Sequence, residues 1–424
     1  MSVSPVKLSD GVDGVYISNS RFNTTTISFN FYLPLRFDTI AENALLPYIL
    51  TSCSAKYKTF TELNMELSML YGADLTVSVN KVGDAQHIKI AVSVINDEYS
   101  LSDTPVTKQA ISLLNELIFN PLTENGAFLS ADTERERRKL LEHVIGEIND
   151  KRIYARNRLI SEMFSGLPAG VSAHGTVDAI QKITNRDLFN AWQRFLTNAY
   201  IRVQVVGKNS PEEIFNDISA KFSGLNRTVD ESFRKTENLL SANAVKRVTD
   251  KMDVTQGKLV MGFSSELHGP DAYALSVATD IFGGGPYSGL FENVREKLSL
   301  CYYCSASAKK LKGYVMVDSG VELENAQKAE KEILNQLEIV KNGKFSEFTY
   351  NASIKSIVGS LNSYNDSIST IDAWYSLNIS NKELKSPEEV ADIISRVTVQ
   401  DVIKAANGIK LHTVYSLLPN KEGE

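Results

Sequence analysis

The stretch IQKITNRDLFNA, residues 180–191, recurs in altered form as ISRVTVQDVIKA, residues 394–405. In the first copy Asp187 follows Thr184 by three residues, and in the second copy Asp401 follows Thr398 in the same way. A threonine with an acid three residues later, before an amphipathic pattern, is typical of a helix N-terminus. Each copy leads into an alternating, strand-like run, over residues 200–207 and 411–418. We therefore expect an internal duplication, because similarity at a fixed spacing marks repeated structural units.

Hydrophobic periodicity outside these repeats predicts a mixture of strands and helices. Alternating apolar residues predict a strand over 25–33 and a hairpin closed at Gly83-Asp84. Apolar residues at helical spacing predict helices over 61–70, 107–119 and 130–164. The last of these helices would bury a stripe formed by Leu140, Leu141, Val144, Ile145 and Ile148. The fold class that follows is α+β, with two homologous domains, each a mainly antiparallel sheet packed with several helices.

The domain boundaries follow from composition. A polar stretch over 224–245 separates the two halves and is typical of an interdomain linker. We therefore expect an N-terminal domain over 1–223 and a C-terminal domain over 246–424. The chain has 424 residues, so that each half is long enough to bury a core of its own.

Composition excludes several classes of protein. Hydrophobic residues make up 43% of the chain and charged residues 23%, which is typical of globular proteins rather than fibrous or disordered ones. The net charge is −6, and the longest basic cluster is Lys309-Lys310-Leu311-Lys312, so we expect no nucleic-acid partner. The N-terminus lacks an apolar segment, and no stretch of about 18 apolar residues occurs, which predicts a cytoplasmic protein without a membrane partner.

Cysteine usage suits a reducing compartment. The three cysteines, Cys53, Cys301 and Cys304, are too few for a four-cysteine metal site. Cys301 and Cys304 fall in a strand-like run, where residues three apart point to opposite faces. We therefore expect these thiols to diverge and to serve as small buried apolar groups.

Common catalytic motifs are missing from the sequence. The five histidines include no H-x-x-x-H or H-x-x-E-H pair, the closest two being His143 and His174. Neither a phosphate-binding loop motif nor a G-x-S-x-G elbow occurs. Gly283, Gly284 and Gly285 follow an apolar helical pattern rather than a strand, which favours a helix-ending turn with permissive φ angles over a phosphate cradle.

Several strings together resemble the pitrilysin/insulinase family of zinc peptidases, in particular its half-length bacterial chains. The run GGGPYSGLFENVREKLSLCY, residues 283–302, resembles the family's glycine-rich turn, Ser-x-Leu-Phe helix and Arg-Glu-Lys end. The resemblance covers nearly the whole chain and implies two homologous α+β domains. It leaves two interpretations of the segment over residues 283–289 open, a simple turn or a contact to the substrate.

The resemblance also implies that the zinc site is lost. Active members carry H-x-x-E-H on the first helix, and the matching run here is ALLPY, residues 44–48. Ala44 and Tyr48 stand at the two histidine positions and Pro47 at the glutamate position. A methyl group cannot coordinate zinc, a proline cannot accept a proton, and a neutral phenol is a poor substitute for imidazole. The family's remaining ligand is a glutamate, and its position holds His143.

A fragment of a metal site remains conceivable on the later helix. Helical spacing puts Glu136, His143 and Glu147 on one face. Such a face fits either two metal ligands or a solvated His143/Glu147 pair. We favour the solvated pair, because the sequence offers no third ligand, and we expect no metal to be bound by this chain.

In the family, an arginine and a tyrosine seven residues apart reach the substrate at the zinc site. Arg295 and Tyr302 have that spacing. The resemblance therefore implies that both side chains bind substrate and stabilise the developing oxyanion at a partner's zinc. The alternative is that Arg295 caps its own helix and Tyr302 packs on a sheet. Ser299 stands where glycine is usual and Cys301 where alanine is usual.

These observations predict a zinc-less subunit of a heterodimeric metallopeptidase that is not an enzyme alone. The expected partner is a homologous subunit with H-x-x-E-H, which binds the zinc, and the expected substrate is a peptide. One alternative is a non-catalytic scaffold or peptide-binding subunit. Another is an independent enzyme built on Glu136, His143 and distant residues.

Overall fold

The computed structural model describes the chain except residues 1–2, 4, 102, 235–243, 380–383 and 421–424. The described residues form two compact units, each assembled from separate segments. Unit 1 comprises Met1–Ile145, Ser172–Lys235 and Tyr364–Ser386, and unit 2 comprises Gly146–Val171, Thr236–Ser363 and Pro387–Glu424. The continuous domains over 1–223 and 246–424 stay a prediction, and part of the expected linker over 224–245 lies outside the described residues.

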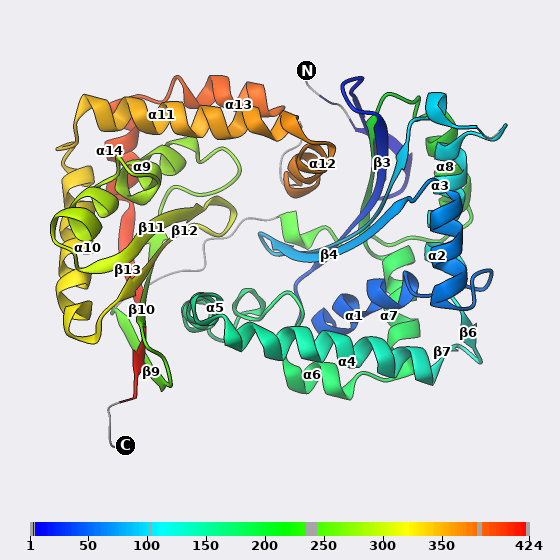
Figure 1. Cartoon of the computed structure of the whole chain (residues 1–424), viewed down its shortest axis with the longest axis horizontal. Coiled ribbons are helices and arrows are strands. Elements are labelled where there is room, and N and C mark those ends of the chain that lie inside the picture. The colour runs from blue at the N-terminus through cyan, green and yellow to red at the C-terminus, as the bar shows by residue number, and fades with distance from the viewer. Residues whose placement is uncertain (1–2, 4, 102, 235–243, 380–383, 421–424) are drawn as a thin grey trace. The chain divides into compact units, whose positions relative to one another are not determined.

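Unit 1 is built on a six-stranded sheet (Figure 1). In spatial order its strands are β1 (Val6–Ser9), β2 (Val12–Ser18), β8 (Tyr200–Gly207), β3 (Thr24–Pro34), β5 (Ala85–Ile95) and β4 (Asp74–Val82). Strands β2 and β8 run parallel, and the other neighbours run antiparallel. The predicted strand over 25–33 is confirmed as β3, and the predicted hairpin joins β4 to β5.

Helices cover both faces of this sheet. On one face lie α1 (Ile40–Leu50), α2 (Phe60–Met69), α3 (Val106–Phe119), α4 (Ser130–Gly146), α6 (Val177–Lys182), α7 (Asn185–Thr197) and α8 (Glu212–Ser223), and on the other lies α12 (Ile368–Leu377). A small hairpin pairs β6 (Thr123–Glu124) with β7 (Ala127–Phe128). Ile27, Phe29 and Phe31 alternate along β3 into a core shared with α1, α3 and α7. The alternating pattern in the sequence thus identified the face that these helices cover.

Unit 2 repeats this order with five strands, β11 (Cys301–Lys309), β12 (Tyr314–Val321), β10 (Gly257–Ser265), β13 (Ile409–Pro419) and β9 (Lys246–Met252). Its helices are α5 (Lys151–Met163), α9 (Tyr273–Gly283), the π-helix η5 (Leu290–Lys297), α10 (Ala326–Lys341), α11 (Glu347–Asn362), α13 (Pro387–Ile394) and α14 (Val399–Asn407). Strand β9 runs parallel to β13, as β2 runs parallel to β8. Reciprocal capping boxes start α7 at Thr184 and α14 at Thr398. The predicted α+β class and the duplication are confirmed.

Two helices are exchanged between the halves of the sequence. Helix α12 follows most of unit 2 along the chain, yet it packs on β3 and β8 of unit 1. Helix α5 precedes most of unit 2, yet it packs on β10 and β13 of that unit. Each sheet therefore has its second face covered by a helix encoded in the other half.

The predicted helix over 130–164 is wrong as a single element. Helix α4 ends at Gly146, a short turn follows, and α5 begins after Asp150, whose carboxylate accepts hydrogen bonds from the amides of Arg152 and Ile153. The predicted buried stripe is also wrong in its second half, because Ile145 is 52% and Ile148 45% exposed. Asp150 caps a new helix within an amphipathic pattern that looks continuous in the sequence, so α4 ends before it and the residues at its end lie outside the core.

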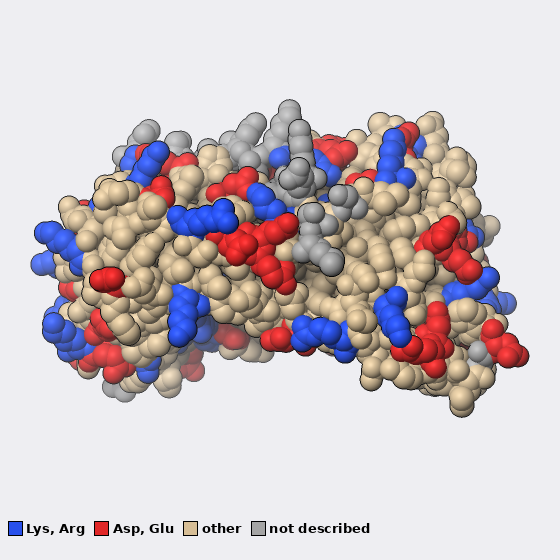
Figure 2. Space-filling model, turned by 90° about the horizontal axis from the view of Figure 1, so that it is seen from above, with Lys and Arg blue, Asp and Glu red and all other residues tan. Residues whose placement is uncertain are grey.

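The surface agrees with the composition. On the face shown in Figure 2, lysine and arginine side chains are scattered among aspartate and glutamate rather than gathered in one basic patch. Among the residues that the structure describes, every helix is too short or too polar to cross a bilayer.

Candidate functional site

The first helix of unit 1 cannot hold a catalytic zinc. Ala44 is fully buried in the core, and α1 continues through Pro47 to Leu50. Tyr48 is half-buried against the same core, and burial raises the pKa of its phenol, so that it stays neutral. The residues at the three family positions therefore supply neither a metal ligand nor a general base.

Helix α4 carries two of the predicted site residues, Glu136 and His143, and they have different neighbours. Glu136 is buried, and its carboxylate accepts hydrogen bonds from Arg135 at 2.8 Å and Lys139 at 3.0 Å. His143 lies two turns further on, where its ring meets His174 edge to face at 5.1 Å between centroids. Glu136 is thus an ion-pairing residue, whereas His143 belongs to another group.

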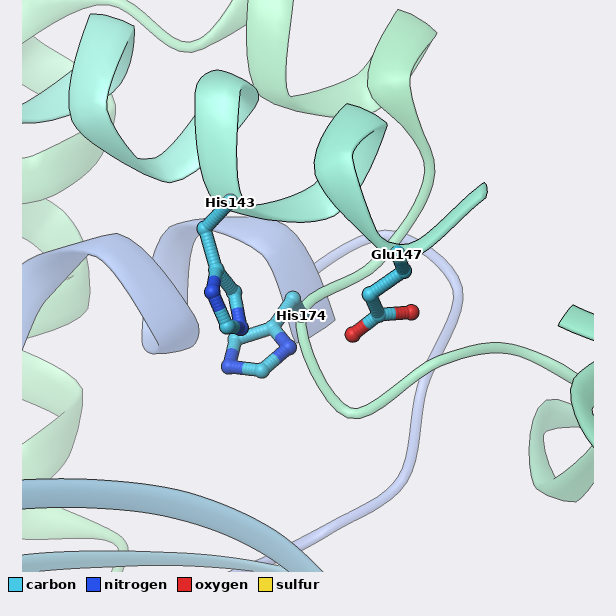
Figure 3. A group of neighbouring side chains, drawn as sticks. All are labelled: His143, Glu147 and His174. Atoms are coloured by element: carbon cyan, nitrogen blue, oxygen red, sulfur yellow. The ribbon is translucent and has the colours of Figure 1, made fainter. Parts of the chain in front are cut away.

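That group joins His143 to His174, both of unit 1 (Figure 3). Burial and the neighbouring His143 lower the pKa of His174 to about 4, so its ring is neutral at physiological pH. The sequence analysis missed His174, because it lies on a loop far from α4 along the chain and no local motif links the two.

In unit 2, Arg295 and Tyr302 line one surface hollow of about 440 Å³. Arg295 lies on the π-helix η5, stacks over the Phe291 ring at 4.6 Å and lies 3.5 Å from a carboxylate oxygen of Glu296. The Tyr302 hydroxyl donates a hydrogen bond to Glu322 at 2.9 Å. This bond raises the pKa of Tyr302, so that the phenol keeps its proton at neutral pH.

A β-bulge places Tyr302 in this hollow. Cys301 pairs with Val321 and Tyr303 pairs with Gly320, so that Tyr302 is the extra residue of β11. Its side chain is 62% exposed. Bulges re-aim side chains and are frequent beside functional sites, and this one turns a phenol out of the sheet.

The same bulge overturns the prediction for the two cysteines. The extra residue resets the alternation of β11, and the buried Cys301 and Cys304 thiols lie close enough to shift each other's pKa. Their interaction lowers the pKa of Cys301 and raises that of Cys304. The prediction that the thiols diverge is therefore wrong, because it assumed an unbroken strand.

The turn between Arg295 and Tyr302 is strained at Ser299. Ser299 adopts a left-handed conformation with φ of 49°, at the position where the family uses glycine. The amide of Leu300 then donates to the carbonyl of Val294 at 3.0 Å. The turn geometry is thus kept although the residue is not glycine.

The glycine-rich segment ends α9, as the sequence predicted. The amide of Gly284 donates to the backbone carbonyl of Asp280 at 2.7 Å, which closes the last turn of the helix. A Cβ at Gly283 would lie 2.8 Å from the backbone nitrogen of Ala306. The prediction of permissive φ angles is wrong, since φ is negative at Gly284 and none of Gly283, Gly284 and Gly285 is among the positive-φ glycines. Close packing requires glycine here, and substrate contact stays a prediction.

Comparison with known proteins decides the family. Over 418 residues the chain is 31% identical to the "Probable inactive metalloprotease YmfF" of Bacillus subtilis, with 96% of each chain covered. The family model "Peptidase M16 inactive domain" matches residues 182–357. The chain is a member of the M16 peptidase family. The resemblance to the pitrilysin/insulinase peptidases is thereby confirmed.

Solved structures agree with this assignment. A conserved protein from Enterococcus faecalis superposes with a TM-score of 0.92 at 26% identity, over 100% of both chains. A "peptidase M16 inactive domain" from Pseudomonas fluorescens has a TM-score of 0.79 at 18% identity, over 99% of both chains. The second likeness shows the fold alone. Together with the residues at 44, 47 and 48, these findings make the chain an inactive-type M16 member without a catalytic zinc.

Proposed function

We propose that this chain is the non-catalytic subunit of a two-chain M16 peptidase, and that Arg295 and Tyr302 act on a peptide bound at the partner's zinc. The observation that supports this most is the shared hollow, into which η5 and the bulge of β11 direct a cation and a neutral phenol. Neither group is needed for a core, since the Arg295 side chain is 41% and Tyr302 62% exposed.

The chemistry of the pair suits amide hydrolysis. Attack on a peptide carbonyl develops negative charge on its oxygen, and preorganised donors stabilise that oxyanion. Arg295 carries a permanent charge and a planar set of N–H donors. The Tyr302 hydroxyl keeps its proton and donates a hydrogen bond to Glu322, and a substrate oxygen would replace Glu322 as the acceptor. Both groups bind and orient the peptide, and the metal that activates water belongs to the partner.

The test is peptide cleavage by the chain reconstituted with an H-x-x-E-H subunit. Arg295→Ala and Tyr302→Phe should each lower kcat/KM by about 10²- to 10³-fold, as loss of one oxyanion donor does. Arg247→Ala is a matched control, because Arg247 is an exposed arginine of unit 2 that pairs with Glu330. Tyr99→Phe controls for loss of an exposed phenol.

Complex formation must be measured beside the rate. If the variants assemble with the partner and cleave at the wild-type rate, the donated role is wrong, and a scaffold or peptide-binding subunit is the better account. If the variants bind the partner more weakly but cleave at the wild-type rate when the partner is in excess, the role of Arg295 and Tyr302 in catalysis is also wrong.

A further inference from the structure

The two cysteines of unit 2 lie on the same face of its sheet. Cys301 pairs with Val321 and Cys304 pairs with Ser319 on the neighbouring strand β12. Val321 and Ser319 are two residues apart on a strand without a bulge between them, so both point to one face. Residues directly opposite each other on paired strands share a face. The bulge at Tyr302 therefore brings both thiols to the same buried side of β11.

The same pairing sets the distance between the two cysteines. Two residues of a strand span about 6.6 Å, and the Cα atoms that a disulfide joins lie up to about 6.8 Å apart. Cys301 and Cys304 each lie opposite one end of such a span, so that a disulfide between them requires only a small shift of β11. Strand β11 is at the edge of its sheet, so this shift disturbs the pairing with β12 alone.

The two thiols differ in how small solutes reach them. Cys301 lines the hollow that also contains Arg295 and Tyr302. Cys304 is 6% exposed and does not line this hollow. Cys301 is therefore the outer thiol of the pair, and Cys304 is the inner one. Both are free cysteines, so that the pair is reduced in this structure.

Their surroundings also divide the two thiols chemically. The interaction with Cys304 and the charge of Arg295 lower the pKa of Cys301, whereas the interaction with Cys301 and burial raise the pKa of Cys304. The thiolate is the form of cysteine that attacks peroxides and disulfides. A cysteine that senses oxidants is typically one with a low pKa and an accessible sulfur beside a second, resolving cysteine. Cys301 fits the first role and Cys304 the second.

We propose that Cys301 and Cys304 are a redox-active pair, which hydrogen peroxide converts from two thiols into one disulfide. The Cys301 thiolate attacks the peroxide, so that an S–O bond forms, the O–O bond breaks and hydroxide leaves. The Cys304 thiol then attacks the sulfur of this sulfenic acid, so that the S–S bond forms and the S–O bond breaks. The proton of Cys304 leaves with the hydroxyl group as water. Two thiols are thereby oxidised, and one peroxide is reduced to two waters.

The disulfide would join the residues on either side of the bulge. Tyr302 lies between the two cysteines along β11, so that the redox state of the pair bears on the backbone that directs this phenol. The bond forms within the isolated chain, and the inference therefore does not rest on the proposed function.

Thiol counting in the isolated full-length chain tests the pair. After brief treatment with hydrogen peroxide, the denatured wild type should have one free thiol instead of three, and dithiothreitol should restore the other two. Trypsin releases both cysteines in one peptide over residues 298–309. This peptide should become lighter by the mass of two hydrogen atoms, which distinguishes the bond within one chain from a bond between two chains.

Separate variants test the two roles. Cys304→Ser should stop at the sulfenic acid on Cys301, which dimedone labels. Cys301→Ala should leave Cys304 reduced, because the inner thiol does not line the hollow. Cys53→Ser is the matched control, since Cys53 is a buried free cysteine of unit 1, and it should form the disulfide as the wild type does. In the wild type Cys53 should react at least about 10-fold more slowly than Cys301, because burial raises the pKa of its thiol.

Two results would overturn the pair. One is a wild type in which Cys301 and Cys304 are oxidised no faster than Cys53. The other is a wild type in which peroxide takes Cys301 to the sulfinic acid while Cys304 stays free, which would show that the two sulfurs do not meet. Neither a partner subunit nor a peptide substrate enters the assay, so failure here leaves the proposal for Arg295 and Tyr302 untouched.

Discussion

In unit 1, the exchanged helix α12 lies on a polar face of its sheet. Asp372 of α12 is fully buried and accepts hydrogen bonds from Ser28 and Gln204 at 2.6 Å and from Lys89 at 2.5 Å. Three strands thus donate to one carboxylate. A smaller apolar cluster around Ile371 accompanies this network.

In unit 2, the exchanged helix α5 lies on an apolar face. Leu159 and Met163 are buried against Val260 and Tyr415. Gly262 leaves room for the helix, because a Cβ there would lie 2.1 Å from the sulfur of Met163. The charged contacts stay at the margin of the face, and the Arg152 side chain is 47% exposed where it binds Asp318.

The two units thus share the order of their strands and the exchange of one helix. They differ in the chemistry of the sheet face that the exchanged helix covers. Hydrogen bonds are directional, so the buried charge network holds α12 only where its donors point at Asp372. Apolar contacts are not directional, so α5 is held by how well its side chains fill the space on the sheet. The halves also differ in the residues at the family's functional positions.

Asp372→Ala should destabilise unit 1 by about 3 to 5 kcal/mol, because it leaves the partly buried ammonium of Lys89 and the buried donors of Ser28 and Gln204 without their acceptor. Asp318→Ala should cost less, since Arg152 can turn to water. Both tryptophans, Trp192 and Trp374, lie in unit 1, so tryptophan fluorescence in a urea titration measures the Asp372 variant. Amide hydrogen exchange in β12 of unit 2 measures the Asp318 variant. Equal losses of stability in the two variants would contradict the difference between the two faces.

Leu159→Ala should destabilise unit 2 by about 2 to 5 kcal/mol through the lost apolar contact and the cavity left behind. Amide hydrogen exchange in β10 and β13 measures this, since α5 packs on both strands. Ile153→Ala is the control on the same helix, because Ile153 is 41% exposed. If both variants speed exchange alike, the apolar face does not hold α5.

Acid should weaken unit 1 through His87, which is buried on β5 and contacts Asn30 at 3.0 Å. Burial lowers the pKa of His87 from 6.5 to about 3. Because the folded-state pKa is the lower one, the unfolded chain takes up the proton first. Stability is then lost as the pH falls below 6.5, by up to about 1.4 kcal/mol for each pH unit.

His87→Gln removes this titration. The stability advantage of the wild type over the variant, measured by tryptophan fluorescence in urea, should shrink between pH 6.5 and pH 4. An advantage that stays constant over this range would show that His87 is not held neutral by the fold.

The smallest effect concerns the turns that follow α2 and η5. Unit 1 uses Gly72 with φ of 73°, whereas unit 2 uses Ser299 with φ of 49°. Ser299→Gly should stabilise the protein by up to about 1 kcal/mol, because relief of left-handed strain exceeds the extra entropy of glycine in the unfolded chain. A lower melting temperature for Ser299→Gly than for the wild type would show that the left-handed backbone at Ser299 is not strained.

Local features of the fold could be predicted from the sequence, and distant ones could not. The caps at Thr184 and Thr398, the hairpin at Gly83-Asp84 and the apolar face of β3 depend on neighbouring residues, and all are confirmed. The exchange of α5 and α12 depends on contacts between far parts of the chain. No periodicity in the sequence encodes such contacts.

The candidate sites follow the same rule. The loss of ligands at Ala44, Pro47 and Tyr48 was visible as a changed motif. The meeting of His143 with His174 was not, because a helix and a loop bring them together in space. The bulge at Tyr302 was hidden as well, since a single extra residue leaves the strand pattern looking regular.

We propose that the chain has lost the catalytic zinc of its family and acts at the zinc of a partner. The deciding measurement is the rate of peptide cleavage at saturating substrate by the reconstituted pair carrying both Arg295→Ala and Tyr302→Phe. We expect a fall of at least about 10²-fold with the complex still assembled. Cleavage at the wild-type rate by the assembled double variant would show that these side chains do not act on the substrate.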